Sequence, residues 1–365
     1  EQSGDNNKAG ADGLYTRIDQ NGDRNTLKIT QSGDDNKAGA SSGGIDQKGN
    51  DDFLTVNQSG NANTLVNVGQ FGSGTSKMTI TQSSNGNRVG STVQDRAIPG
   101  GTAATGDNAM TITQKTGDGN NVDRAEQDGV ANKLVILQNG TANSIGGALQ
   151  GDFNNGGPDG SSNDNGGAFA INNSTNGFMK ITQRGTGHSV ELAGQSGDSN
   201  RLTVDQANTD QTVIAAVQIG SDNVGVVDQS GHGNTATVDV TGDLNKTRIT
   251  QSGALATGSI MVINGFENDL TLTQQGGAQL ATLTVDGGIG NKVKALQKGP
   301  GLNTMELLIS GNDNVGDVLQ DGCDNELVGV VGGSDNSFTT KQTGAGNSIN
   351  FTQGGVGNSY SAIQG

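Results

Sequence analysis

Apolar and polar residues alternate in short segments that recur from one end of the chain to the other. The segment "NTLKITQ" from Asn25 places Leu27 and Ile29 on one face of an extended strand and Lys28 on the other. The segment "NSINFTQ" from Asn347 repeats the arrangement. Alternation with a period of two is typical of a half-buried β-strand. We therefore predict an all-β fold built from many strands of about seven residues each.

An amide side chain stands at each end of these segments, on the same parity as the apolar residues, so we expect both amides to face inward. A buried Asn or Gln costs free energy unless it is paired. Stacked copies would let each amide donate to the next, as in the ladders of cross-β structures. The alternative, that these amides only cap loops, does not explain why Gln keeps the core parity at the strand end. The predicted ladder consists of Gln20, Gln31, Gln58, Gln138, Gln195, Gln206, Gln229, Gln342, Gln353, Asn25, Asn63, Asn132, Asn200, Asn234, Asn347 and Asn358.

The spacer "Q-x-G-x-x-N" between two segments predicts a tight turn, because Gly allows backbone angles that other residues avoid. The turn glycines expected on this pattern are Gly22, Gly33, Gly60, Gly129, Gly197, Gly231 and Gly344. The corresponding inward apolar residues, the predicted core, are Leu27, Ile29, Leu134, Ile136, Leu202, Val204, Ile349 and Phe351.

Successive Gln residues are mostly 11 or 12 positions apart, so two strand–turn units span about 22–23 residues. That length is one coil of a two-sided β-solenoid, in which coils bury a face only by stacking, with a rise of about 4.8 Å per coil. Where the Gln spacing doubles, an apolar residue is expected in the vacant position. These residues are Val240, Ile263, Val285, Ile309 and Val331.

The repeat continues on both sides of every interruption, which predicts a single solenoid domain over residues 1–365. Four stretches rich in Gly, Ser, Asn or Ala interrupt the rhythm. We expect them to be insertions at solenoid corners, near residues 8–19, 37–46, 95–107 and 151–177.

The composition separates this chain from ordinary globular domains. Hydrophobic residues make up 30% of its 365 residues, against roughly 45–50% in typical domains, and 62 residues are Gly. The regular apolar positions argue against disorder. A formal net charge of −16 disfavours binding to nucleic acid, and no apolar run approaches the ~18 residues of a membrane span. No signal peptide is recognisable at Glu1, so we interpret the chain as a mature, processed form or a trimmed one.

Residues able to carry chemistry are few. His188 and His232 lie apart in predicted turns, and neither fits a metal site or a catalytic triad. Carboxylates such as Asp34 and Asp118 cluster at turns, where calcium binding stays an alternative to simple solvation. Cys323 is expected to be an incidental exposed thiol. We predict no catalytic residues, no cofactor and no metal, so the chain is not expected to be an enzyme.

The strand–turn pattern resembles the curlin repeat, the repeat of the major subunit of curli, a secreted functional amyloid of Gram-negative biofilms. The segments "QSGDSNRLTVDQ" from Gln195 and "QTGAGNSINFTQ" from Gln342 are closest to the curlin pattern. Similar repeats cover nearly the whole chain outside the insertions. The resemblance implies a protein exported unfolded through an outer-membrane secretion pore, folding outside the cell, often on a nucleator subunit, and polymerising into matrix fibres. This chain is longer than the familiar subunit and has apolar residues at some amide positions.

The first and last residues follow the same repeat pattern as the rest of the chain. We therefore expect uncapped solenoid ends that act as templates for the next copy. The function expected is therefore that of a structural subunit of an extracellular, curli-like amyloid fibre that supports biofilm matrix and adhesion, with itself as partner. The alternatives are a curli nucleator, or a soluble solenoid adhesin or ice-binding protein with outward Thr residues such as Thr111 and Thr113.

Overall fold

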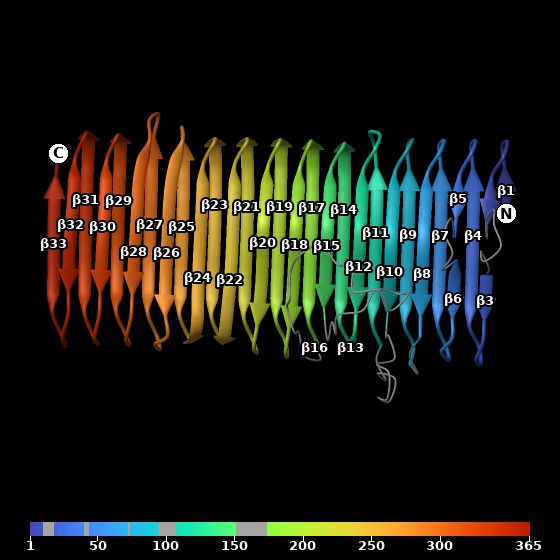
Figure 1. Ribbon diagram of the computed structural model, residues 1–365, viewed down its shortest axis with the longest axis horizontal. Helices are drawn as coiled ribbons and strands as arrows, with labels where there is room; N and C mark the ends of the chain where they lie inside the picture. The colour runs from blue at the N-terminus through green and yellow to red at the C-terminus, as the bar shows by residue number, and fades with distance from the viewer. Residues whose placement is uncertain (10–17, 40–43, 72–73, 95–106, 151–173) are drawn as a thin grey trace. The chain divides into compact units, whose positions relative to one another are not determined.

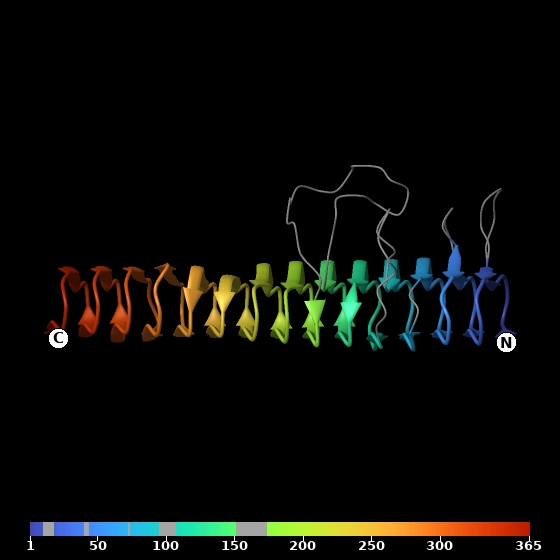
Figure 2. The same ribbon diagram turned by 90° about the horizontal axis from the view of Figure 1, so that it is seen from below.

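The computed structural model describes residues 1–9, 18–39, 44–71, 74–94, 107–150 and 174–365. The chain divides into two compact units, Glu1–Asn200 (unit 1) and Arg201–Gly365 (unit 2). Each unit is a parallel β-solenoid in which the chain alternates between two sheets, called sheet A and sheet B below. Figure 1 shows the strands of each unit side by side, and Figure 2 shows the two sheets as separate layers.

In unit 1, sheet A is formed by strands that follow one another in chain order. They are β1 (Gln2–Ser3), β4 (Thr26–Ser32), β7 (Phe53–Ser59), β9 (Lys77–Ser83), β11 (Ala109–Lys115), β14 (Lys133–Thr141) and β17 (Phe178–Thr186). All pairings are parallel and in register, so like residues stack on like. Met78 pairs with Met110 and Ile80 with Ile112.

Sheet B of unit 1 contains β2 (Lys8–Ala9), β5 (Lys37–Ala38), β8 (Thr64–Gln70), β10 (Arg88–Gln94), β12 (Asn121–Gln127), β15 (Ser144–Gln150) and β18 (Ser189–Ser196). The short strand β3 (Ile18–Gln20) pairs with β6 (Ile45–Gln47), which also pairs with β8. A further short pair, β13 (Gly129–Val130) with β16 (Ser174–Thr175), lies at a turn.

Unit 2 repeats the design. Its sheet A contains β19 (Arg201–Thr209), β21 (Val224–His232), β23 (Lys246–Ala254), β25 (Asp269–Gly276), β27 (Lys292–Gly299), β29 (Val315–Cys323), β31 (Ser337–Ala345) and β33 (Ser359–Gln364). Its sheet B contains β20 (Thr212–Ile219), β22 (Thr235–Asp243), β24 (Thr257–Phe266), β26 (Gln279–Asp286), β28 (Asn303–Ile309), β30 (Glu326–Val331) and β32 (Ser348–Gln353).

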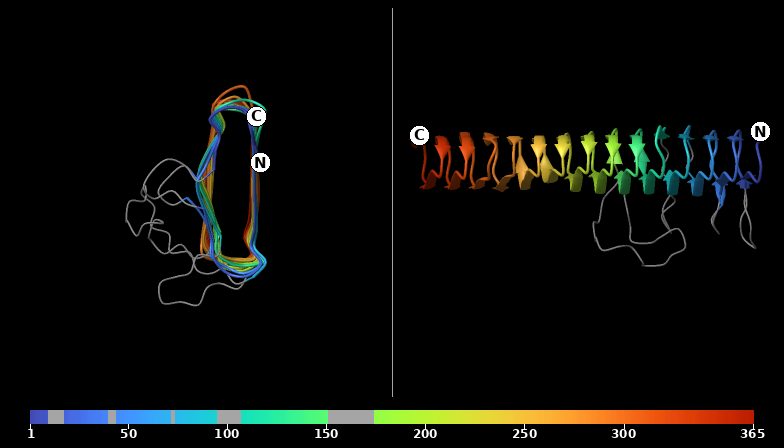
Figure 3. Two further views of the ribbon diagram at one scale, coloured as in Figure 1. Left: turned by 90° about the vertical axis from the view of Figure 1, so that its right-hand side faces the viewer. Right: turned by 90° about the horizontal axis from the view of Figure 1, so that it is seen from above.

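Figure 3 shows the two sheets as facing layers, and the core of each unit lies between its own two sheets. It consists of the alternate residues that point inward from each strand. Leu134, Ile136, Leu202 and Val204 are 0% exposed, which places them in this core. The prediction of a two-sided, all-β solenoid with stacked coils is therefore confirmed.

One expected core residue lies elsewhere. Ile263 was predicted to fill a vacant Gln position, but it is 38% exposed, and Val262 occupies that position opposite Val240 and Val285. The pairing is regular up to Val262, so alternation points Val262 inward and turns the next residue, Ile263, outward. The register shift of β24 against β22 comes only after this point, between Val240 and Gly242.

The predicted insertions fall largely on residues 10–17, 40–43, 95–106 and 151–173, which lie outside the described residues. The expectation of a single domain over residues 1–365 stays a prediction.

Candidate functional site

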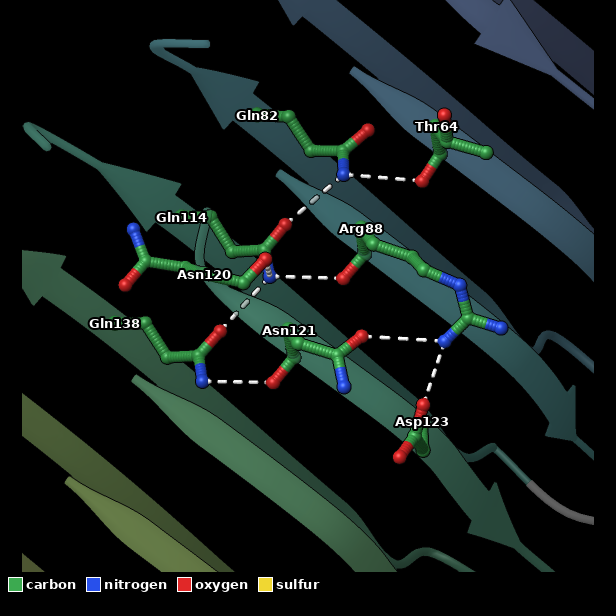
Figure 4. A network of polar contacts seen from close by, with 8 residues as sticks. All are labelled: Thr64, Gln82, Arg88, Gln114, Asn120, Asn121, Asp123 and Gln138. Carbon is green, nitrogen blue, oxygen red and sulfur yellow. Dashed lines mark hydrogen bonds and ion pairs between the residues drawn. The ribbon is translucent and has the colours of Figure 1, made fainter. Parts of the chain in front are cut away.

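A column of Gln side chains runs through the core of unit 1 at the end of the sheet A strands. Gln82 Nε2 donates to Gln114 Oε1 at 2.9 Å, and Gln114 Nε2 donates to Gln138 Oε1 at 2.8 Å (Figure 4). All three side chains are 0% exposed. The column extends from Gln2 through Gln31 and Gln58 to Gln183 by the same bond.

Backbone carbonyls of sheet B fix the direction of this column. Gln114 Nε2 also donates to the carbonyl oxygen of Arg88 at 3.0 Å, and Gln138 Nε2 donates to that of Asn121 at 2.9 Å (Figure 4). A carbonyl oxygen can only accept, so the nitrogen of each amide must lie on that side. Every Gln in the column therefore donates toward the coil that follows it in the sequence.

The same column exists in unit 2, and a second one follows sheet B of unit 1. In unit 2 the Nε2–Oε1 distances are 2.7–3.0 Å from Gln206 through Gln229, Gln251, Gln274, Gln297 and Gln320 to Gln342. In sheet B of unit 1 they are 2.8–3.0 Å from Gln20 through Gln47, Gln70, Gln94, Gln127 and Gln150 to Gln195.

Asn residues at the strand starts form columns that run in the opposite direction. Asn63 Oδ1 accepts from both the backbone N–H and the Nδ2 of Asn87, each at 3.1 Å. Asn245 Oδ1 accepts from Asn268 in the same way. A backbone N–H can only donate, so the oxygen of each Asn must face the following coil. The Asn–Asn bonds therefore run toward the preceding coil, against the direction of the Gln–Gln bonds, while Nδ2 also reaches a backbone carbonyl of the following coil.

The Asn side chain also secures the turn beside it. Asn36 Nδ2 donates to the carbonyl oxygen of Ser32 at 2.9 Å and to that of Gly60, in the next coil, at 2.7 Å. Among the predicted ladder residues, Asn132, Asn200 and Asn234 bond a turn carbonyl of their own coil in the same way. One amide thus pairs between coils and closes a turn, which accounts for its recurrence at one position.

The structure places the predicted ladder and core residues on the inner parity, with exposure rising toward the terminal coils. Gln20 and Asn358 are exposed, while Asn25, Asn347, Leu27 and Ile29 are half-buried. Gln353, Ile349 and Phe351 are buried at 7%, 4% and 5% exposure. The remaining predicted residues of both sets are 0–1% exposed. Inner positions near an edge strand have a neighbouring coil on one side only, which leaves part of each side chain uncovered.

Each predicted turn glycine has a positive φ, from 89° at Gly33 and Gly197 to 117° at Gly22. At Gly231, φ is 106° and an added Cβ would lie 1.8 Å from the carbonyl oxygen of Gly253 in the next coil. The turn therefore needs Gly both for its backbone angle and for close stacking.

The ladders are interrupted at identifiable positions. Asp52 occupies an Asn position and is fully buried, and neither carboxylate oxygen has a hydrogen-bond partner among the described residues. Burial raises the pKa of Asp52 to about 6. In sheet B of unit 2, Val240, Val262, Val285, Ile309 and Val331 replace the Gln column.

Gln353 follows this apolar column, opposite Val331. Its Oε1 is buried and has no hydrogen-bond partner among the described residues, because Val331 cannot donate. Its Nε2 still donates to the carbonyl oxygen of Asn358 at 2.7 Å.

Sequence reasoning did not identify a third column, formed by the residue after the turn glycine. Asp34 Oδ1 accepts from the backbone N–H of Asp5 at 2.8 Å, and Asn61 Oδ1 accepts from that of Asp34 at 2.9 Å. Asp118 bonds to Asn85 in the same manner. The signal was the recurrence of Asp and Asn at this turn position, which suits side chains that bond neighbouring backbone.

The histidine and cysteine side chains considered for chemistry lie within the repeat and are not grouped into a site. His188 is 0% exposed in an Asn position, and its backbone N–H donates to Asn143 Oδ1 at 3.2 Å. Cys323 is a half-buried free thiol. Within the described ranges, no group of three or more His, Cys, Asp or Glu side chains is placed to hold a metal ion. The same ranges contain no helix of the length and apolarity that a membrane crossing requires.

The stacking geometry can be compared with known families. The family described as Curlin associated repeat matches residues 217–253, which run from the end of β20 through β21 and β22 into β23. Residues 217–253 are therefore a curlin-associated repeat. Within the matched part, Gln229 donates to Gln251 at 2.8 Å. Asn234 occupies the neighbouring Asn position, and its Oδ1 accepts from the backbone N–H of Ala256 in the next coil. A comparison with curated proteins found no match.

The curlin repeat and the solenoid together point to a structural rather than an enzymatic protein. The candidate functional site is accordingly not a pocket. It consists of the two sets of amide columns and the backbone edges at which a stack can be extended.

Proposed function

We propose that this protein is a structural subunit of an extracellular, curli-like amyloid fibre whose copies stack head to tail. The observation that carries the proposal is the opposite direction of the Gln and Asn columns. A stack built this way offers Gln donors and Asn acceptors toward its C-terminal edge. It offers Gln acceptors and Asn donors toward its N-terminal edge.

Two such edges fit each other in one orientation only. When a C-terminal edge meets the N-terminal edge of another copy, each Gln donor faces a Gln oxygen and each Asn oxygen faces backbone and side-chain N–H groups. When two like edges meet, one copy is turned over, so the facing strands run antiparallel and each Gln position faces an Asn position instead of another Gln. A buried amide left without its partner costs about 1–3 kcal/mol, so loss of the in-register Gln–Gln and Asn–Asn pairs is penalised at every column.

The edge strands favour the same conclusion. Strand β33 pairs with β31 on one side, and its Ile363 is 72% exposed. An edge strand with unpaired backbone groups and apolar side chains is a template for another strand. Joining edges of different kinds does not close on itself and produces an open filament.

The surroundings of such a fibre follow from the family. A curli-like subunit would act outside a Gram-negative cell, in biofilm matrix and adhesion, after passage through an outer-membrane secretion pore and with a nucleator subunit as partner. These assignments are part of the proposal and rest on the repeat alone.

The test is to release the chain from denaturant into plain buffer and follow it by electron microscopy and X-ray fibre diffraction. We expect fibres with a meridional reflection at ~4.7–4.8 Å that seed fresh monomer. Imaging of single fibres should show unequal growth at the two ends, because the two edges differ in their donors and acceptors. A chain that stays monomeric for days, or fibres that grow equally at both ends, would contradict the proposal.

A further inference from the structure

Two sheet faces of this molecule carry charges of a single sign. The sheet A strands of unit 1, β1 to β17, contain no Asp or Glu, whereas β4, β9, β14 and β17 contribute the outward lysines Lys28, Lys77, Lys133 and Lys180. The sheet B strands of unit 2, β20 to β32, contain no Lys or Arg and contribute Asp239, Glu306 and Glu326. The net charge of the chain is −16, so a carboxylate-free face runs against its overall charge.

The lysines are most concentrated on β14 and β17. Lys133 pairs in register with Phe178, and Val135 pairs with Lys180, so Lys180 lies one strand across and two residues along from Lys133. Lys133 Nζ lies 5.9 Å from the centre of the Phe178 ring. Val135, Leu137 and Phe178 are half-buried on the same outer face. These five residues are called the basic patch.

The carboxylates are concentrated in the same way on β28 and β30. Thr304 pairs with Glu326, and Glu306 pairs with Val328, so the two glutamates also lie one strand across and two residues along from each other. Leu308 and Val330 are 40% and 39% exposed beside them. Glu306, Glu326, Val328, Leu308 and Val330 are called the acidic patch.

The two patches match in spacing and in chemistry. One strand across and two residues along corresponds to about 8 Å between like charges in either patch, from the strand spacing and the rise per residue. Each patch also has three apolar side chains on its outer face. Exposed apolar residues beside charges of one sign are typical of an interaction surface.

The two other sheet faces do not offer this match. Sheet B of unit 1 pairs its own charges, with Arg88 bonded to Asp123 and Arg124 to Glu126. Sheet A of unit 2 mixes both signs, and Lys246 lies directly beside Asp269. A face that neutralises its own charges gains little from a charged partner.

We propose that the basic patch of one copy docks on the acidic patch of another copy, so that stacked fibres associate side by side. The occupant of each patch is therefore a second copy of this chain. This lateral contact rests on the proposed fibre function but uses outward side chains that take no part in head-to-tail stacking. Its strength falls as salt rises, because charges on a surface are screened within about 8 Å at 0.15 M ionic strength.

The experiment compares four chains: wild type, the pair Lys133→Glu and Lys180→Glu, the pair Glu306→Lys and Glu326→Lys, and the combination of all four substitutions. Each pair makes the two patches alike in charge, and the combination restores opposite charges. We expect wild type and the combined variant to form bundles, seen as wide fibres by electron microscopy and as low-speed pellets. We expect both pairs to form single fibres and to lose the pellet.

A matched control is the pair Lys28→Glu and Lys77→Glu. It makes the same charge change on the same face, but Lys28 on β4 and Lys77 on β9 are separated by β7, so the two charges lack the one-strand spacing of the basic patch. We expect this control to keep its bundles. If all variants bundle as wild type does, or if the combined variant fails to recover, the lateral contact is wrong while the fibre function stands.

A chain that forms no fibres would instead contradict the proposed function, and the patches can still be tested on it. The same variants are then compared as soluble chains by sedimentation velocity at low and physiological salt. Patch docking predicts salt-sensitive self-association that each pair abolishes and the combination restores. Equal sedimentation of all four chains would overturn the docking.

Discussion

Asp52 occupies a position at which most coils have Asn, and the difference is a single atom type. In other coils the amide nitrogen donates to turn carbonyls, as Asn36 does to Ser32 and Gly60. A carboxylate oxygen cannot donate, and burial removes the water that would stabilise an ionised carboxylate. The buried site therefore favours the protonated acid, in keeping with the pKa of about 6.

This pKa predicts a specific pH dependence for unit 1. The folded pKa of about 6 lies above an unfolded value of ~3.9, so between these values the folded chain keeps a proton that the unfolded chain loses. The free energy of unfolding should fall as pH rises from ~4 to ~6 and stay at the lower value above that. Asp52→Asn should remove this dependence and stabilise the fold at pH 7 by up to about 3 kcal/mol.

Denaturant titrations at several pH values measure the effect. The control is Asp51→Asn, because Asp51 is on the surface and paired with Arg24, which lowers its pKa. That variant should retain the fall in stability between pH 4 and 6. A pH profile that Asp52→Asn leaves unchanged would show that Asp52 does not carry the proton.

Large and small residues compensate each other at single positions of the core. In sheet A, Gly316 pairs with Phe338, and Phe338 with Tyr360, while Phe338 and Phe351 have ring centres 5.7 Å apart. A Cβ added to Gly316 would lie 1.9 Å from the Phe338 ring. The ring occupies the space that a side chain on the preceding coil would need.

Gly316→Ala should therefore destabilise unit 2 by about 1–3 kcal/mol, the usual cost of overpacking. Adding Phe338→Leu should recover part of that loss, because it removes the ring that the methyl group meets. The free energy of unfolding of the two single variants and the double variant forms a cycle. Additive losses would contradict direct contact between these two positions.

At the scale of elements, a Gln column makes each strand depend on its neighbours on both sides. Gln114 accepts from Gln82 and donates to Gln138, so its removal leaves one unpaired donor and one unpaired acceptor in the core. The apolar column of unit 2 has no such dependence. Where the two kinds of column meet, at Val331 and Gln353, one acceptor is already left unpaired.

Gln114→Leu should accordingly cost about 2–6 kcal/mol, the sum of two buried groups at 1–3 kcal/mol each with little compensation from the added apolar surface. The comparison is Gln275→Leu on β25, since Gln275 is exposed. That change should shift stability by less than about 0.5 kcal/mol. The denaturant midpoints of both variants measure the two losses of stability. Equal losses would show that a Gln in the buried column stabilises the fold no more than an exposed Gln does.

At the scale of the whole molecule, charge opposes assembly while the amide columns favour it. The net charge of −16 makes copies repel one another. Salt should therefore shorten the lag of fibre growth as ionic strength rises to ~0.15 M, and lowering the pH toward the pI near 4.3 should do the same. Amyloid-dye fluorescence measures the lag. A lag that lengthens with salt would show that attraction between charges, and not repulsion, controls the encounter.

The sequence determined the strands, the turns and the inward face of each strand. The period-two alternation around residues such as Leu202 and Val204 leaves one arrangement that buries them, and Gln-x-Gly-x-x-Asn leaves few turn geometries. Because the coils have similar sequences, parallel in-register stacking is the arrangement that pairs most of the inward amides. The solenoid could therefore be predicted from the spacing alone.

Only the tertiary structure decided the direction of the columns, since an amide is symmetric in the sequence and its orientation depends on which backbone group it meets. It also decided the position of Val262 in place of Ile263, because pairing with Val240 and Val285 fixes which of the two adjacent apolar residues points inward. Stacking also places Lys133 beside Lys180 and Glu306 beside Glu326, which gives the two patches their matching spacing. Residues that are far apart in the chain become neighbours through stacking, and stacking is a property of the folded coil.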